Sequence, residues 1–398
     1  MAVVVGRGAV TPLGHTLATS MDRLLAGEGA IGPITRFDAS SFPVNIGAEG
    51  PRVHRADGSV EDEAVALCRA WLGAALDQGL DGVDLDPVPP ARRGVFLGAE
   101  ASRPPVDQLV AALDGKLAPA ETVRAHAPWA LVRETAERAG ALGPAAVLST
   151  ACTSSGQAVG EALLAIERGE VDVAIAAGVD MLVHPLMLAG FARLGALSTR
   201  NDAPERASRP FDLDRDGFVL GEGAGVVVLA SERVAGRVGP RLGRVSGYGC
   251  SSNAWRITDS PPDGRGALEA MEAALDHAGV GRDGVAWVHA HGTSTKQNDQ
   301  SEAAAIRRAL GGSWEQTPVS STKGAMGHLV AACGVVGVAI AVEALARGQA
   351  PATRNLERPD PQCQVRHVQP GEGLRLGAAV VNAFGFGGVN ASVVVEGA

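Results

Sequence analysis

The sequence predicts an α/β protein whose sheets are covered on both faces. Short apolar runs without a regular polar alternation are typical of buried strands. Longer stretches with apolar residues every three or four positions separate these runs and are typical of amphipathic helices. The chain has 398 residues, of which 46% are hydrophobic, and that is enough for a large core. The alternation of the two patterns predicts a layered α/β architecture.

The expected elements follow one another along the whole chain. The expected strands are residues 3–6, 93–98, 145–150, 171–178 and 224–230. The expected helices are residues 61–79, 154–168, 266–278, 301–310 and 329–347. Residues 84–93 are rich in proline, and residues 206–217 are rich in charged and turn-forming residues, so both segments are expected to be loops.

A second half of related design is indicated near residue 244. Residues 244–249 (RVSGYG) echo residues 4–8 (VVGRG) near the start of the chain. We therefore expect two similar halves, residues 1–240 and 241–398.

Composition excludes several classes of protein. Lysine and arginine number 35 against 44 acidic residues, a net charge of −9, which does not suit a general nucleic-acid surface. Five scattered cysteines, with no C-x-x-C pair, fit free thiols in a reducing compartment. The first residues read as a strand and not as a signal sequence, and we expect no apolar run of membrane-spanning length. A cytoplasmic protein is therefore expected.

Cys152 is the candidate nucleophile. It follows the expected strand 145–150 and precedes the expected helix 154–168. Backbone N–H groups at a helix N-terminus favour negative charge, so this position is expected to lower the pKa of the thiol and to produce a thiolate. The alternative is a small cysteine buried beside a strand. A reactive thiolate here would hold a substrate as a thioester.

Histidines in two later segments are candidate proton donors and acceptors. His291 follows an apolar strand and opens the segment HGTST (291–295), and His328 closes the segment SSTKGAMGH (320–328). His289 and His291 form an H-x-H pair that can ligate a metal, but no acidic or cysteine cluster lies near at ligand spacing. A buried, hydrogen-bonded His289 is therefore favoured, and no metal is expected. The hydroxyls of Thr293 and Thr295 would either hydrogen-bond an amide-bearing arm or satisfy a turn.

Two further features have both a structural and a functional interpretation. Lys323 would ordinarily be solvated, but Glu302 at the start of a helix offers it a charge partner. A glycine-rich turn lies close to the C-terminus. It is either a tight turn between buried strands or a hinged gate whose backbone N–H groups face an oxyanion. Its residues are Phe384, Gly385, Phe386 and Gly387.

Together with Cys152, His291 and His328, four further motifs give the chain a family resemblance. They are residues 6–14 (GRGAVTPLG), 196–202 (ALSTRND), 208–212 (SRPFD) and 216–223 (DGFVLGEG). Over nearly its whole length the chain resembles the decarboxylating β-ketoacyl-ACP synthases, in the branch of synthase II and the type II polyketide ketosynthases. Thiolases would need a second catalytic cysteine, and the acyl-CoA-primed synthases use Cys–His–Asn.

The resemblance implies a fold and an activity. The fold would be the thiolase fold, a five-layered αβαβα core of two similar halves, as a dimer. Cys152 would take an acyl group from an acyl carrier protein, and His291 and His328 would hydrogen-bond the malonyl thioester as it loses carbon dioxide. The resulting carbanion would attack the acyl-Cys152 thioester, a decarboxylative Claisen condensation.

The resemblance also implies supporting roles. Backbone N–H groups of Cys152 and Phe386 would hold the oxyanion, and Lys323, paired with Glu302, would orient the site. Thr293 and Thr295 would contact the phosphopantetheine arm that the carrier protein supplies, so no cofactor of the chain's own is expected. The turn that contains Phe384, Gly385, Phe386 and Gly387 would gate the second substrate.

The chain departs from the family pattern at several positions. His289, Trp255 and Cys333 stand where Asn, Tyr and a small residue are usual, and Gly195 stands where an arginine that meets the carrier protein is frequent. Arg193 and Arg200 are the remaining candidates for carrier docking.

Three alternatives remain open from the sequence. The first is a non-elongating partner subunit like a chain-length factor, although such subunits lack the nucleophile that Cys152 provides. The second is a metal-dependent hydrolase built on His289 and His291. The third concerns the pathway and assembly, because fatty-acid and polyketide or polyene enzymes share these residues, whether as homodimers or as heterodimers with a ketosynthase-like chain-length factor. Nucleic-acid and membrane partners are not expected.

Overall fold

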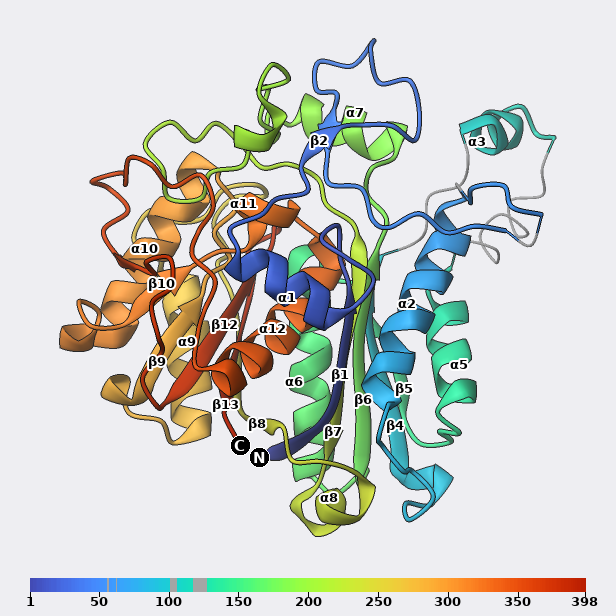
Figure 1. Ribbon diagram of the computed structural model, residues 1–398, viewed down its shortest axis with the longest axis vertical. Coiled ribbons are helices and arrows are strands. Elements are labelled where there is room, and N and C mark those ends of the chain that lie inside the picture. Colours follow the sequence, from blue (N-terminus) through green and yellow to red (C-terminus); the bar gives the residue numbers. More distant parts are fainter. Residues whose placement is uncertain (56, 62, 101–105, 117–126) are drawn as a thin grey trace.

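The computed structural model describes residues 1–55, 57–61, 63–100, 106–116 and 127–398 (Figure 1). The strands are β1 Ala2–Val10, β2 Gly32–Pro33, β3 Ile46–Gly47, β4 Arg93–Ala99, β5 Ala145–Leu148, β6 Val173–Asp180, β7 Gly223–Ala230, β8 Gly243–Ser252, β9 Val285–His289, β10 Pro318–Ser320, β11 Arg366–His367, β12 Ala378–Phe384 and β13 Val389–Glu396. The helices are α1 Leu17–Leu25, α2 Ala64–Leu80, α3 Val106–Leu113, α5 Trp129–Arg138, α6 Ser154–Glu167, α7 Pro185–Arg193, α8 Glu232–Val238, α9 Arg265–Ala278, α10 Lys296–Leu310, α11 Lys323–Met326 and α12 Cys333–Arg347.

The main sheet consists of two runs of strands with the same topology. The first run has the order β1-β7-β6-β4-β5, and the second has the order β8-β13-β12-β9-β10, with the short β11 added at its edge. In each run the first two pairings are antiparallel and the next two are parallel. The runs join through a short antiparallel pairing of β1 with β8. The chain is thus built from two related halves, and the expected boundary between residues 240 and 241 stays a prediction.

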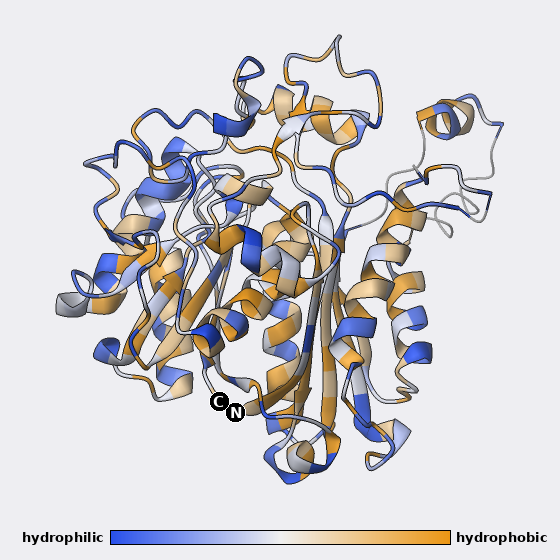
Figure 2. Ribbon diagram, viewed as in Figure 1, coloured by the Kyte–Doolittle hydropathy of each residue, from blue (hydrophilic) through white to orange (hydrophobic). Residues whose placement is uncertain are grey.

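The elements form five layers. Helices α6 and α12 lie in the centre, and each contacts strands of both runs (Figure 1). Helix α2 covers the outer face of the first run, together with α5, and α9 covers that of the second, with α10 packed on α9. The strands are largely hydrophobic, whereas hydrophilic residues gather mainly on the loops (Figure 2). This is the αβαβα arrangement expected from the sequence.

The two central helices approach each other closely near their first turns. A Cβ atom on Gly334 of α12 would lie 2.3 Å from the backbone nitrogen of Gly156 in α6. The hydroxyl of Ser155 accepts a hydrogen bond from the N–H of Val335 at 3.0 Å. Glycine permits such a backbone approach because it carries no side chain. The N-terminal ends of α6 and α12 are therefore fixed beside each other.

Most expected elements are present with small changes in their bounds, and two helices start elsewhere. Helix α10 begins at Lys296, five residues before the expected start, because the Thr295 side chain caps it by accepting from the N–H of Asn298. Helix α12 begins at Cys333 and not at residue 329, because residues 330–332 form a 3₁₀ turn in which Val330 has φ +36°. Helices α1, α3, α5, α7, α8 and α11 were not predicted from the sequence.

One helical stretch is apolar enough to be compared with a membrane span. Residues 330–347 have a mean hydropathy of 1.9 over 18 residues, so the expectation that no apolar run reaches membrane-spanning length is wrong. In the structure 72% of this stretch is buried inside the protein. Its apolar character is therefore explained by its place in the central layer, where a helix is covered on all sides.

Candidate active site

The candidate site lies beyond the carboxyl ends of parallel strands from both halves. Cys152 follows β5, His291 follows β9, and Lys323 follows β10. In α/β sheets, loops at this end of the strands carry the binding and catalytic groups. Because the two halves face each other across α6 and α12, the loops of both reach the same place.

Cys152 sits in a strained turn that leads into α6. It is the middle residue of a 3₁₀ turn, Ala151–Thr153, directly before α6. Ala151 has φ +53°, a left-handed conformation that costs a non-glycine residue about 1–2 kcal/mol. The turn carries the thiol inward, where Cys152 is buried but lines the site cavity.

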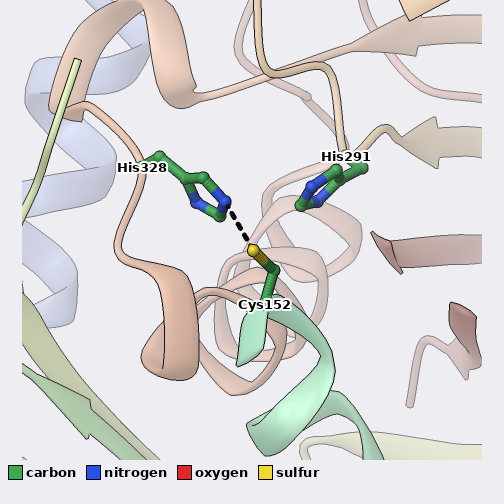
Figure 3. A group of neighbouring side chains, drawn as sticks. All are labelled: Cys152, His291 and His328. Atoms are coloured by element: carbon green, nitrogen blue, oxygen red, sulfur yellow. Dashed lines mark hydrogen bonds between the residues drawn. The ribbon is translucent and has the colours of Figure 1, made fainter. Parts of the chain in front are cut away.

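Two imidazoles flank this sulfur (Figure 3). His328 Nε2 lies 3.1 Å from Cys152 Sγ. The His291 and His328 rings cross at 80° with their centroids 5.1 Å apart. One potential ligand atom from each of the three residues lies within 4.8 Å of the others. The structure thus brings together the three residues that the sequence singled out first.

A backbone group fixes the tautomer of His328. The N–H of Val330 donates to His328 Nδ1 at 3.2 Å, so Nδ1 is an acceptor. In a neutral imidazole the other nitrogen then carries the hydrogen. His328 Nε2 is therefore a hydrogen-bond donor that points at Cys152 Sγ. The backbone N–H of Phe386 also faces the sulfur and favours its negatively charged form, which lowers the pKa of the thiol.

Burial keeps all three groups neutral. It raises the pKa of the Cys152 thiol, and nearby Lys323 and the Phe386 N–H oppose the rise only in part. Burial, followed by the charge of Lys323, holds the pKa of both His291 and His328 well below the ordinary histidine value. The expected lowering of the thiol pKa by the helix N-terminus is therefore wrong, because desolvation outweighs the helix field.

The expected ion pair between Lys323 and Glu302 is also wrong. Within the described residues no carboxylate lies within 4.0 Å of Lys323, whose Nζ instead donates to the carbonyl oxygen of His291 at 2.5 Å. Glu302 accepts hydrogen bonds from the N–H groups of His291 and Gly292, each at 2.7 Å, and from the Asn382 side chain at 3.0 Å. Burial raises the pKa of Glu302 to about 7. Both residues hold the His291 backbone, Lys323 through its carbonyl oxygen and Glu302 through its N–H.

The two threonines line the cavity from a loop that a buried network anchors. The hydroxyls of Thr293 and Thr295 lie 3.1 Å apart. Asp299 accepts from the N–H of Thr293 at 3.0 Å, and the buried Arg215 donates to the carbonyl oxygen of Thr295 at 3.0 Å. The hydroxyls are thus held toward the cavity, and their contact with an arm stays a prediction.

The glycine-rich turn connects β12 with β13 and packs against Cys152. A Cβ atom on Gly385 would lie 3.6 Å from the Cys152 nitrogen. The Phe384 ring lies 5.9 Å from that of His291, and Gly387 has φ +88°. The turn places the Phe386 N–H near the sulfur and the rings of Phe384 and Phe386 on the cavity wall, as the gate interpretation requires. Opening of the gate stays a prediction.

A cavity of about 310 Å³ leads to these groups. Its lining includes the apolar side chains of Phe191, Leu194 and Phe218 and the polar side chains of Gln297 and Asn298. A cavity of this size with a mixed lining admits a slender chain that carries amide groups.

Sequence reasoning missed Glu100, which follows β4. Its carboxylate accepts hydrogen bonds from the Ala151 N–H at 3.0 Å and from the hydroxyls of Ser149 at 2.7 Å and Ser154 at 3.3 Å. A lone acidic residue after a strand gives no signal in the sequence, because its partners lie about fifty residues away. Glu100 holds the strained turn that presents Cys152.

The metal site built on His289 and His291 is not assembled. His289 Nε2 lies 3.3 Å from the Thr322 hydroxyl, and burial lowers the pKa of His289 to about 3. In the part of the chain that the structure describes, the one group with metal-ligand spacing is Cys152, His291 and His328. A metal-ligating histidine normally donates its other ring N–H, whereas His328 Nδ1 accepts one. The donor set therefore does not fit a metal.

Comparisons with known proteins agree over the whole chain. Residues 2–235 match the model of the β-ketoacyl synthase N-terminal domain, and residues 242–357 match the C-terminal domain. The chain is 37% identical to 3-oxoacyl-[acyl-carrier-protein] synthase 2 of Synechocystis sp., over 99% of this chain and 97% of that protein. It is equally identical, with the same coverage, to a putative polyketide β-ketoacyl synthase 1 of Streptomyces cyaneus.

A solved structure supports the same conclusion about the fold. The ishigamide ketosynthase/chain length factor superimposes with a TM-score of 0.85 at 28% identity, covering 100% of this chain and 99% of that one.

Alkylation of Cys152 tests the high thiol pKa. Because burial favours the neutral thiol, the rate of alkylation of Cys152 by iodoacetamide should rise with pH from 6 to 9 without reaching a plateau. Peptide mass spectrometry follows the modification, with the exposed Cys250 as the internal reference. A plateau of the Cys152 rate below pH 7 would instead reveal a stable thiolate.

Replacement of Glu100 tests its support of the turn. Glu100→Ala leaves the Ala151 N–H without its acceptor and should lower the free energy of unfolding by about 1–3 kcal/mol in urea titrations. It should also slow the alkylation of Cys152. Glu134→Ala, which removes a surface ion pair with Arg69, is the control and should change neither quantity measurably. Equal behaviour of the two variants would exclude the role of Glu100.

Proposed function

The chain belongs to the β-ketoacyl synthase family, and we propose that it condenses an acyl group held on Cys152 with a malonyl unit carried by acyl carrier protein. Like the relatives named above, the chain is an acyl-transferring ketosynthase. The observation that carries the proposed roles is the group of Cys152, His291 and His328 at the end of a 310 Å³ cavity.

Acyl transfer to the sulfur is the first proposed step. Cys152 Sγ attacks the carbonyl carbon of the incoming thioester, and the oxyanion that forms is held by backbone N–H groups of Cys152 and Phe386. The bond to the pantetheine sulfur breaks, and the thiol proton passes to that sulfur. A buried neutral thiol suits this step because the proton is delivered where the new thiolate needs it.

Loss of carbon dioxide follows when the malonyl thioester enters. His328 Nε2–H, and a ring N–H of His291, donate to the thioester carbonyl oxygen. Neutral imidazoles fill this role since they donate without needing a proton from solution. The carboxylate leaves as carbon dioxide, and its bonding electrons become those of an enolate that the two donors stabilise.

Carbon–carbon bond formation closes the cycle. The enolate carbon attacks the carbonyl carbon of the acyl-Cys152 thioester. The backbone N–H groups of Cys152 and Phe386, which held the first oxyanion, hold this second oxyanion as well. The bond to Sγ breaks, and one proton from solvent restores the thiol. The product is a β-ketoacyl group on the carrier protein.

The supporting residues act through the backbone that they hold. Lys323 and Glu302 would orient His291 through its own peptide groups. Thr293 and Thr295 would hydrogen-bond the amides of the phosphopantetheine arm, and Phe384 and Phe386, with Gly385 and Gly387, would admit the second substrate. The arm arrives with the carrier protein, so we propose no cofactor resident in the chain.

We also propose a dimer that forms at the edge of the sheet. Strand β5 is the edge strand of the first half, and its residues are partly or fully exposed. An unpaired edge of this kind invites a strand of another chain. The partner is a second copy or a chain-length-factor subunit, of the kind present in the ishigamide complex. A partner that lacks the nucleophile is the alternative role that Cys152 argues against for this chain.

The pathway remains either fatty-acid or polyketide synthesis, because relatives of both kinds are equally similar. We propose a cytoplasmic location, which fits five free cysteines in the described residues.

Acylation of Cys152 is the direct test of the function. Incubation with an acyl-loaded carrier protein should add the acyl mass to Cys152, as seen by peptide mass spectrometry. Cys152→Gln should abolish condensation yet still release carbon dioxide from malonyl carrier protein, since the two imidazoles remain. Cys250→Ser is the matched control and should behave as the unaltered chain. A folded chain without any adduct would refute the proposal.

Removal of the His328 donor tests the decarboxylation step. His328→Ala should lower the rate of carbon dioxide release from malonyl carrier protein by about 10²–10³-fold, the usual loss for one oxyanion donor. The matched control is His277→Ala, because His277 is a partly exposed histidine paired with Glu167. An unchanged rate in His328→Ala would remove His328 from the mechanism.

A further inference from the structure

Three large apolar side chains stand exposed around the mouth of the active-site cavity. Leu194, at the end of α7, lines the cavity and is 57% exposed. Trp255 and Ile257 are 46% and 83% exposed, and the next residues, 258–260, line the cavity. Exposed apolar side chains gathered at a functional opening mark an interaction surface, because water solvates them poorly.

Backbone hydrogen bonds tie Trp255 and Ile257 to the gating turn. The N–H of Gly387 donates to the Ile257 carbonyl oxygen at 2.6 Å, and the N–H of Asn253 donates to the Gly388 carbonyl oxygen at 2.6 Å. The exposed residues therefore keep a fixed position relative to Phe386 and the sulfur. A partner that contacts them is placed in register with the cavity.

Two cations border these apolar side chains without an acidic partner. The Arg265 guanidinium lies 5.3 Å from the centre of the Trp255 ring. Arg193 directly precedes Leu194. Among the described residues, no carboxylate lies within 4.0 Å of Arg193 or Arg265, whereas Arg256 on the same loop pairs with Asp259 at 3.2 Å. The two free charges are available to carboxylates of a partner.

We propose that Leu194, Trp255, Ile257, Arg193 and Arg265, here called the mouth rim, form the docking surface for the carrier protein. The inference rests on the proposed function. A thioester arm that reaches Cys152 through this mouth keeps its protein over the rim for as long as the arm is inside. The charges and apolar groups of the rim then specify the carrier surface, which presents an apolar patch flanked by carboxylates.

The rim differs from a purely basic docking patch in its physical character. Burial of Leu194, Trp255 and Ile257 contributes apolar area, which salt does not screen, and only the two arginines contribute a screened attraction. Docking therefore depends on a few central contacts, among them the Trp255 ring, which the guanidinium group of Arg265 flanks.

Comparison of two acyl donors tests the rim. One donor is the hexanoyl form of a type II carrier protein, and the other is hexanoyl-pantetheine, which carries the same thioester without the protein. Ile257→Ser and Arg265→Glu should each lower kcat/KM for Cys152 acylation by the carrier about tenfold. Both should leave kcat/KM for hexanoyl-pantetheine within about twofold, because neither side chain lines the cavity. Leu376→Ser and Arg237→Glu, at exposed positions away from the mouth, are the matched controls and should change neither value.

The outcomes separate the docking inference from the function beneath it. Equal losses with both donors, or no loss with either, would overturn the rim as a docking surface. Acylation of the unaltered chain by hexanoyl-pantetheine but not by the carrier would overturn it as well. If neither donor acylates the unaltered chain, the proposed function fails and the inference fails with it.

Discussion

The site depends on one hydrogen bond from a backbone N–H to an imidazole. Val330 donates to His328 Nδ1, so His328 presents a donor and not a base to the Cys152 sulfur. The backbone conformation that allows this bond is unusual, since Val330 has φ +36° within the turn that precedes α12. The same bond that gives the site its polarity makes the cluster unsuitable for a metal. The strain is stored where the chemistry needs a fixed tautomer.

Duplication of the half-fold brings this donor to the sulfur. Each half ends its parallel strands at the same edge and sends one helix into the central layer. Gly156 and Gly334 let these helices touch near their first turns. Cys152 precedes one helix and His328 precedes the other, so the site forms only when the halves are joined.

Exclusion of water governs the charge state of the site. Desolvation keeps the thiol neutral although the buried Lys323 lies close to it. For the two imidazoles, desolvation and the charge of Lys323 act together to favour the neutral ring. Among the residues that the structure describes, no carboxylate lies within 4.0 Å of Lys323, which donates its hydrogen bond to the carbonyl oxygen of His291. The positive charge opposes protonation of the two rings and favours negative charge on the sulfur. Such an arrangement stabilises anions that form during a reaction more than it stabilises a resting thiolate.

The sequence by itself determined the alternation of strands and helices, the family resemblance and the identities of Cys152, His291 and His328. These depend on local pattern and on motifs, which a chain carries in its order of residues. The tertiary structure alone decided the tautomer of His328, the raised pKa of Cys152, the separation of Lys323 from Glu302 and the part played by Glu100. Each of these depends on desolvation or on a hydrogen bond between segments distant in the chain or around a strained turn. Residue order does not specify such distances, because packing sets them.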